Sequence, residues 1–166
     1  MQRVVVIGSP GSGKSTLARK LAQRTGLPLV HLDAEYWSAG WVEMKRSNWV
    51  AHVDRLAAAP SWIIDGNYGG TLMQRIARAD TAVWLDYPTA LCLARVLRRW
   101  VLHRGKTRPD MAPGCPERLD PAFLMYVVRF RAEWRIRNRD ALAGFAGQVH
   151  HFTRPADAQR WLATLA

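Results

Sequence analysis

Long apolar runs are missing from this chain of 166 residues. No stretch approaches the roughly 20 apolar residues that a membrane-spanning helix needs, so we expect no membrane segment. The two cysteines, Cys92 and Cys115, are too few for a disulfide framework. Because the chain opens directly on an apolar run typical of a strand, we expect no signal peptide and a cytoplasmic protein.

Acidic residues are also scarce, since 13 Asp and Glu stand against 24 Lys and Arg and leave a formal net charge of +11. Half of the basic residues, 12 of the 24, fall between Arg95 and Arg139, where only 4 acids offset them. Such a segment can bind nucleic acid or clamp the phosphates of a small ligand, and part of it is ordinary solvated surface. Composition leaves these alternatives open.

A glycine-rich pattern near the amino terminus is the most specific feature of the sequence. The stretch from Gly8 to Ser15 reads GSPGSGKS and matches G-x-x-x-x-G-K-[ST], between an apolar run and a helical pattern. Glycines let the backbone curl around phosphate oxygens, and the N–H groups form an anion-binding nest at a helix N-terminus. Lys14 can reach the β- and γ-phosphates, and Ser15 can bind Mg²⁺. The residues expected to hold the nucleotide are Gly8, Gly11, Ser12, Gly13, Lys14, Ser15 and Thr16.

Five apolar runs alternate with helical patterns along the chain. The runs cover residues 3–7, 29–32, 61–64, 81–85 and 148–152. Their continuous apolar character favours strands buried on both faces of a parallel sheet. The helical patterns have apolar stripes at residues 17–22, 49–56, 72–76, 93–101, 124–134 and 158–165. This alternation predicts an α/β fold, in which ligands bind at the carboxyl ends of the strands.

The stretch Gly105–Pro121 breaks the pattern because its four prolines exclude a regular helix. It lies between two arginine-bearing helical segments. Long irregular loops in compact domains are usually functional, so we interpret residues 104–121 as a lid within a single domain that spans residues 1–166. The alternative is a surface insertion, although its basic residues differ from the Ser/Gly content of a linker.

Three acids follow apolar runs at the edge where the site is expected. Asp65, directly before Gly66, is the preferred metal-side acid, and Asp86 is either its rival or a helix cap. Asp33 can accept a hydrogen bond from a substrate hydroxyl or act as general base, with a cap or turn role as the alternative. His31 is expected to be a hydrogen-bonded core residue.

The order of these motifs resembles the adenylate-kinase-like branch of P-loop kinases, and more closely the subgroup labelled "DNA topology modulation protein". Apart from the generic phosphate loop, the resemblance rests on short words spread over nearly the whole chain. These words are VHLD (30–33), GW (40–41), WIIDGNY (62–68), LDYP (85–88), RGKTRPD (104–110) and GCPE (114–117).

The resemblance implies a three-layer α/β/α fold whose five-stranded parallel sheet has the phosphate-loop strand at its centre. It also implies ATP with Mg²⁺, with Asp65 on the metal side and with arginines of the lid and of the returning helix close to the phosphates. The lid arginines are Arg104 and Arg108, and those of the returning helix are Arg131, Arg135 and Arg137. The expected catalytic residues are Lys14, Asp33, Asp65, Arg104, Arg108 and Arg135.

The sequence departs from adenylate kinases on the acceptor side. Those enzymes have Phe-Pro-Arg after the Asp-Gly pair, whereas this chain has Asn67, Tyr68 and Gly69. AMP is therefore disfavoured, and a hydroxyl-bearing acceptor held by Asp33 and Asn67 is at least as compatible, as in kinases that resemble shikimate kinase. We expect an ATP/Mg²⁺-dependent phosphotransferase acting on a small-molecule acceptor.

Two other functions stay open. The net charge permits a nucleic-acid-associated or regulatory ATPase, although no DNA-reading motif is recognisable. A nucleotide-binding protein without catalysis is the third possibility.

Overall fold

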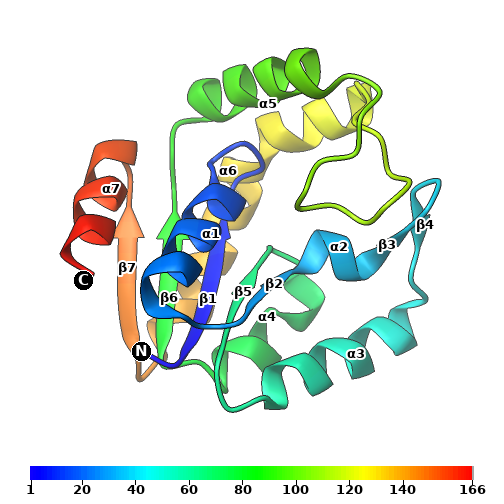
Figure 1. The fold of residues 1–166 in the computed structure, drawn as a ribbon. Coiled ribbons are helices and arrows are strands. Elements are labelled where there is room, and N and C mark those ends of the chain that lie inside the picture. The colour runs from blue at the N-terminus through cyan, green and yellow to red at the C-terminus, as the bar shows by residue number, and fades with distance from the viewer. Residues whose placement is uncertain (166) are drawn as a thin grey trace.

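A parallel sheet of five strands forms the centre of the structure, a computed structural model that describes residues 1–165 (Figure 1). The strand order is β2 (Leu29–His31), β5 (Trp62–Asp65), β1 (Arg3–Gly8), β6 (Thr81–Leu85) and β7 (Gln148–Phe152). All four neighbouring pairs are parallel, so the carboxyl ends of the strands share one edge. The expected five-stranded parallel sheet with the phosphate-loop strand at its centre is confirmed.

Helices cover both faces of this sheet because its central strands β5, β1 and β6 are buried on both sides. Val4 and Val6 face one core, which also contains side chains of α1 (Lys14–Thr25) and α7 (Pro155–Thr164). Val5 and Ile7 face the other core. That second core also contains side chains of α3 (Arg46–Ala58), α4 (Gly69–Ile76) and α6 (Pro121–Ala143). The three-layer α/β/α arrangement follows from this two-sided burial.

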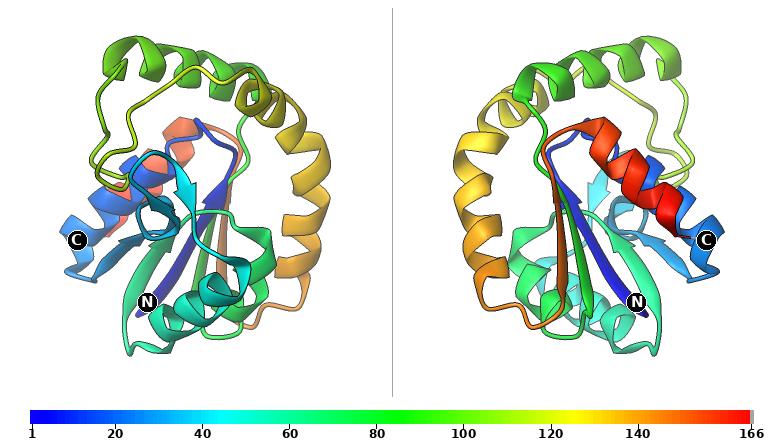
Figure 2. Two further views of the ribbon diagram at one scale, coloured as in Figure 1. Left: turned by 90° about the vertical axis from the view of Figure 1, so that its right-hand side faces the viewer. Right: turned by 90° about the vertical axis from the view of Figure 1, so that its left-hand side faces the viewer.

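The remaining elements lie over the carboxyl edge of the sheet. Helix α5 (Thr89–His103) crosses above the strand ends, and α6 returns along the side of the sheet (Figure 2). Helix α2 (Leu32–Tyr36) leads into a hairpin of two short strands, β3 (Trp37–Ser38) and β4 (Val42–Glu43). This small antiparallel pair was not predicted from the sequence.

Residues 104–120, between α5 and α6, form no helix and reach across to the β3–β4 hairpin. The backbone N–H of Gly40 donates to the carbonyl of Gly114 at 2.9 Å. In addition, the indole N–H of Trp41 donates to the carbonyl of Pro116 at 3.2 Å. Met111 is buried with its neighbours against the tryptophans of the hairpin. The segment predicted as a lid is therefore closed against the hairpin in this structure.

The apolar stripe predicted for α5 is only partly correct. Within the predicted stripe Val96 is buried, but Leu97 is exposed and Val101 is 65% exposed, because the carboxyl-terminal half of α5 extends beyond the sheet. Among residues 1–165, none of the helices combines the length and apolar character needed to cross a membrane.

Candidate functional site

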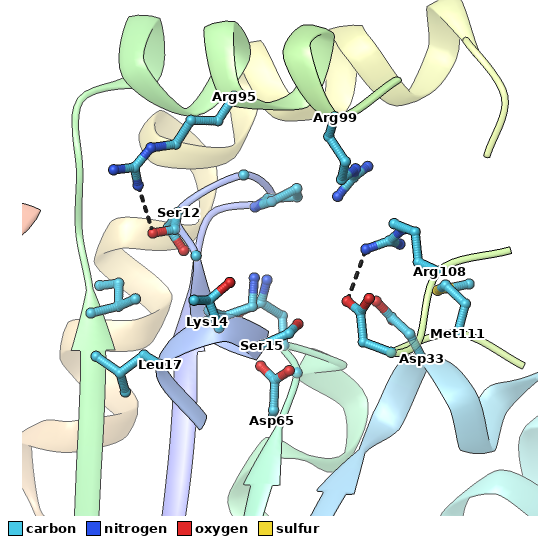
Figure 3. A pocket seen from close by; sticks show the side chains of 18 of the residues that line it. Ser12, Lys14, Ser15, Leu17, Asp33, Asp65, Arg95, Arg99, Arg108 and Met111 are labelled. Carbon is cyan, nitrogen blue, oxygen red and sulfur yellow. Dashed lines mark hydrogen bonds and ion pairs between the residues drawn. The ribbon is translucent and has the colours of Figure 1, made fainter. Parts of the chain in front are cut away.

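A cavity of about 960 Å³ opens at the carboxyl edge of the sheet. Its floor is the loop between β1 and α1, and the ends of β2 and β5 bring in carboxylates from one side (Figure 3). Helix α5, the lid and α6 form the remaining walls. Proteins with parallel sheets bind ligands at this edge, so the position agrees with the expectation from the sequence.

At two positions of the phosphate loop, the neighbouring backbone lies too close for any residue other than glycine. Gly11 has φ of 79°, and a Cβ there would collide with the carbonyl oxygen of Cys92 on α5. Gly8 has φ of 149°, and its Cβ would collide with the carbonyl oxygen of Leu85. Any side chain at either position would push the loop away from its neighbours, so the loop keeps its shape only with glycine.

The loop is fastened to the end of β5 by Asn67. Its side-chain amide N–H donates to the carbonyl of Gly8 at 2.7 Å, and its side-chain oxygen accepts from the N–H of Gly8 at 3.0 Å. This reciprocal pair fixes the point where the strand turns into the loop. The role differs from the contact with an acceptor that the sequence suggested for Asn67.

Lys14 lies in the cavity and turns toward its own loop. Its ammonium donates to the carbonyl of Ser9 at 3.1 Å. Burial lowers the pKa of Lys14, whereas the carboxylates of Asp65 and Asp33 act in the opposite direction. From α5, Arg95 donates to the carbonyl of Ser12 at 3.0 Å and adds a second positive charge at the loop (Figure 3).

Asp65 has the features of a metal-side carboxylate. One of its oxygens pairs with the Nδ1 atom of His31 at 2.9 Å, so His31 is hydrogen-bonded as expected, although it is only partly buried. The other oxygen is buried and has no hydrogen-bond partner among residues 1–165, and the Asp65 side chain lies on the side of the cavity that holds Lys14 and Ser15 (Figure 3). Because Mg²⁺ prefers carboxylate and hydroxyl oxygens, this unpaired oxygen together with Ser15 fits the ion. Within residues 1–165, no group of three or more His, Cys, Asp or Glu side chains is placed to hold a metal.

Asp33 approaches the cavity from the start of α2 and receives one strong contact. The hydroxyl of Tyr68 donates to its carboxylate at 2.8 Å. Burial raises the pKa of Asp33, and the hydrogen bond from Tyr68 partly offsets this rise. A desolvated carboxylate with a raised pKa is suited to accept a proton from a hydroxyl group.

Asp86 has a different environment from Asp65. Its carboxylate pairs with Arg131 at 3.0 Å and with Arg135 at 2.9 Å, and His151 lies 3.3 Å away. The N-cap of α5 is Pro88, so Asp86 does not cap that helix. None of these four residues lines the large cavity, and the structure therefore does not bring Arg135 to the other expected catalytic residues.

The lid places one of its two expected arginines in the cavity. Arg108 forms ion pairs with Asp110 at 2.8 Å and with Glu117 at 2.7 Å. Arg104 lies outside the cavity, with its guanidinium over the ring of Trp100. Arg99 of α5 lines the cavity and pairs with Glu117 at 2.9 Å, a role that sequence reasoning missed. Its spacing of one helical turn from Arg95 is the signal that could have revealed it.

Arg75 organises the loop after β5 from below. It is fully buried, and its guanidinium donates to the carbonyls of Gly66, Asn67 and Tyr68. Burial lowers the pKa of Arg75 to about 9. These contacts support Tyr68, whose φ of 36° lies in the left-handed region that residues with a side chain rarely adopt. Arg75 is thus a positioning residue for both Asn67 and Tyr68.

We expect Arg75→Met to lower the free energy of unfolding by roughly 2–4 kcal/mol, because it leaves buried carbonyls without a donor. The measurement is denaturant unfolding followed by circular dichroism. Arg78→Met is the matched control, since Arg78 pairs with the half-exposed Asp54 and such surface pairs contribute at most about 1 kcal/mol. Equal losses in the two variants would contradict the role given to Arg75.

Comparison with known protein families finds a match to the ATPase family associated with various cellular activities (AAA) over residues 4–64. Among curated proteins, the shikimate kinase of Rhodopseudomonas palustris is 35% identical over 111 residues, which cover 58% of this chain and 55% of the relative. The shikimate kinase of Paramagnetospirillum magneticum is 30% identical over 113 residues, which cover 58% of this chain and 57% of the relative. The chain thus spans somewhat more than half the length of these relatives.

Solved structures share the fold. A shikimate kinase from Acinetobacter baumannii in complex with shikimate has a TM-score of 0.61 and 17% identity, with 99% of this chain and 92% of that chain covered. A gluconokinase from Sinorhizobium meliloti has a TM-score of 0.54 and 17% identity, with coverage of 99% and 93%. Together with the matched phosphate loop, these similarities support a P-loop nucleotide-binding protein with relatives among small-molecule kinases.

Proposed function

We propose that this protein transfers the γ-phosphoryl group of ATP, with Mg²⁺, to a hydroxyl group of a small molecule. One observation carries the proposal: the phosphate loop and the carboxylates of Asp33 and Asp65 line one cavity (Figure 3), and one oxygen of Asp65 has no hydrogen-bond partner among residues 1–165. Phosphoryl transfer needs little covalent chemistry from a protein, and it depends on positioning and on charge stabilisation.

The nucleotide side of the cavity would hold the phosphates of ATP. When ATP binds, the ammonium of Lys14 would leave the carbonyl of Ser9 and bind phosphate oxygens instead. Their negative charge would stabilise the ammonium, which burial otherwise disfavours. Ser15 and Asp65 would hold Mg²⁺, directly or through water, and the ion supplies charge neutralisation at the phosphates.

Asp33 would orient the acceptor and take its proton. The acceptor oxygen forms a new bond to the γ-phosphorus, the bond from that phosphorus to the bridging oxygen breaks, and ADP leaves with the electron pair. The proton of the acceptor hydroxyl passes to the carboxylate of Asp33, whose raised pKa favours this step. Arg108 and Arg99, which both line the cavity, would stabilise the negative charge of the transferring group.

The closed lid supports transfer over wasteful hydrolysis. Its contacts with the β3–β4 hairpin enclose the cavity from the side opposite α6. Enclosure of this kind excludes water from the reacting phosphate. Opening and closing of residues 104–120 would then admit ATP and release ADP.

The alternative of a nucleic-acid-associated ATPase draws on the basic segment and on the resemblance to the DNA topology modulation subgroup. Several arginines of that segment form ion pairs within the chain, however. Arg99 and Arg108 pair with Glu117, and Arg131 and Arg135 pair with Asp86. This internal pairing favours the small-molecule kinase.

The proposal is tested by ADP formation from ATP and Mg²⁺ in the presence of hydroxylated metabolites, nucleoside monophosphates or duplex DNA. We expect one class of hydroxylated small molecule to stimulate ADP formation and to appear as a phosphorylated product. Stimulation by DNA alone, without a phosphorylated product, would establish the ATPase alternative instead.

A change in pH profile tests the contact between Tyr68 and Asp33. The hydrogen bond from Tyr68 stabilises the charged carboxylate, so Tyr68→Phe should raise the pKa of Asp33 further. The acidic limb of the kcat profile should therefore move to higher pH. Tyr36→Phe is the control, because its hydroxyl bonds to Glu43 at the surface and should leave the profile in place. If kcat depends on pH in the same way in Tyr68→Phe and in the native protein, the hydrogen bond from Tyr68 does not set the pKa of Asp33.

A further inference from the structure

We propose that Glu117 is a positioning residue, whose carboxylate holds the guanidinium groups of Arg99 and Arg108 together and leaves their terminal nitrogens to bind the γ-phosphoryl group of ATP. This inference rests on the proposed function and adds the means by which two arginines of different elements act on one phosphoryl group. It depends on the burial of Glu117, on the atoms that its carboxylate contacts and on the anchoring of its backbone.

Glu117 is a buried acid in the wall of a cavity that we expect to hold phosphates. Its side chain is only 5% exposed and lines the cavity. Burial of a carboxylate requires partners that compensate its charge. Both partners here are arginines: the Nε of Arg99 donates to Oε1 at 2.9 Å, and the Nε of Arg108 lies 2.7 Å from Oε2. Each carboxylate oxygen thus contacts one guanidinium group.

The two arginines contact Glu117 through Nε, which leaves most of their N–H groups for a ligand. A guanidinium carries its other N–H groups on two terminal nitrogens. Among residues 1–165, the terminal nitrogens of Arg99 have no hydrogen-bond partner, and Arg108 gives only Nη1 to Asp110, at 2.8 Å. Terminal N–H groups in this fork geometry match the oxygens of a phosphate, so the two side chains fit a phosphoryl group.

The arginine pair (Arg99 and Arg108) brings two like charges into one part of the cavity. Arg99 extends into it from α5, and Arg108 extends into it from the lid (Figure 3). Burial lowers the pKa of Arg99, the positive charge of Arg108 lowers it further, and the carboxylate of Glu117 acts in the opposite direction. Glu117 therefore offsets the repulsion between the guanidinium groups and keeps both beside the phosphate site.

The backbone holds Glu117 at the point where the two ends of the lid meet. Its N–H donates to the carbonyl of Lys106 at 2.9 Å, and its carbonyl accepts from the N–H of Gly105 at 3.3 Å. The carboxylate thus projects from an anchored position in the lid, whereas Arg99 belongs to α5. The arginine pair therefore assembles when the lid lies against α5.

Binding of two nucleotides to the full-length protein with Mg²⁺ tests this role, because AMP-PNP carries a γ-phosphate and ADP lacks one. Glu117→Gln keeps the shape of the side chain and removes its charge. We expect it to weaken binding of AMP-PNP roughly tenfold, about the effect of one lost hydrogen bond to a charged group, and to leave the Kd of ADP unchanged. Calorimetry measures both affinities.

Glu43→Gln is the matched control. Glu43 lies in β4 outside the cavity and accepts a hydrogen bond from Tyr36, so its replacement should leave both affinities unchanged. Tighter binding of AMP-PNP by Glu117→Gln would show that the carboxylate competes with the γ-phosphate, and it would overturn the inference. Unchanged affinities, or equal losses for ADP and AMP-PNP, would overturn it as well.

Arg99→Lys tests the same arrangement without a change at Glu117. Lysine keeps a positive charge for the carboxylate, but its single ammonium offers a phosphate no fork of terminal nitrogens. We expect AMP-PNP to bind roughly tenfold more weakly to this variant and ADP to bind as to the native protein. Native affinity for AMP-PNP would contradict the division of the guanidinium between Glu117 and the phosphate.

The native protein is the reference for both variants. If it binds ADP and AMP-PNP and the variants change the two affinities alike, only the role of Glu117 is wrong. If the native protein binds neither nucleotide, the proposed function itself fails.

Discussion

Replacement of Lys14 by alanine is expected to lower the rate of phosphoryl transfer by roughly 100- to 1,000-fold or more, as loss of a preorganised charge at a transition state does. The ammonium lies in the cavity above the phosphate loop, where it donates a hydrogen bond to the carbonyl of Ser9. Burial lowers the pKa of Lys14, because it destabilises the charged ammonium. Phosphate oxygens of a bound nucleotide would stabilise that charge. The measurement is steady-state ADP formation with the acceptor present.

The fold should survive this change. Because the native ammonium is desolvated, Lys14→Ala removes a buried charge and should leave the Tm equal or higher. Lys45→Ala is the control, since Lys45 is exposed at the start of α3 and should keep full activity. Wild-type turnover in Lys14→Ala would refute the assignment of the phosphate site.

Asp33→Asn is expected to lower kcat by about 100- to 10,000-fold while it raises the Tm at neutral pH. The loss of activity follows from removal of the proton acceptor. The gain in stability follows from the pKa, which burial raises in the folded state. Such a group stabilises the fold fully below its unfolded pKa, and this contribution is lost as pH rises through the folded pKa, so at a pH above its unfolded pKa the buried carboxyl group is a net cost to stability.

The asparagine oxygen can still accept the hydrogen bond from Tyr68, which keeps the local packing. Asp54→Asn is the control, because Asp54 lies on α3 away from the cavity and its pKa is lowered by Arg78. It should keep kcat and should not raise the Tm. An Asp33→Asn variant with native kcat would contradict the role of general base, and one with a lower Tm would contradict the cost of burial.

The features that the sequence predicted correctly depend on local patterns. Continuous apolar runs such as Val4–Ile7 specify strands buried on both faces, and the spacing from Gly8 to Ser15 specifies the phosphate loop. Asp65 and Asp33 could be placed near this loop because the carboxyl ends of parallel strands share an edge. These inferences need no knowledge of distant contacts.

The features that were missed depend on residues far apart in the chain. The pairing of Asp86 with Arg131 and Arg135 joins positions more than 40 residues apart, and no local pattern shows it. Arg75 looks like a surface residue of an amphipathic helix, yet it is fully buried beneath the loop after β5. The strands of the β3–β4 hairpin have two residues each, too few for a periodic signal.

The aromatic rings that line the cavity could also be identified only from the structure. Trp37 and Trp41 could be suspected of walling a pocket, but Tyr126 and Trp134 belong to a helix whose stripe indicates only packing. Because α6 returns beside the cavity, these two rings become part of its lining. Their place in the site therefore follows from topology, whereas the phosphate loop follows from the motif.

Calorimetric titration of the native protein with AMP-PNP and Mg²⁺ tests the central claim most directly. The arrangement of the loop, Lys14 and Asp65 predicts saturable binding of one nucleotide per chain, weakened when Mg²⁺ is removed by a chelator. Absence of any heat of binding with magnesium present would contradict the account at its base.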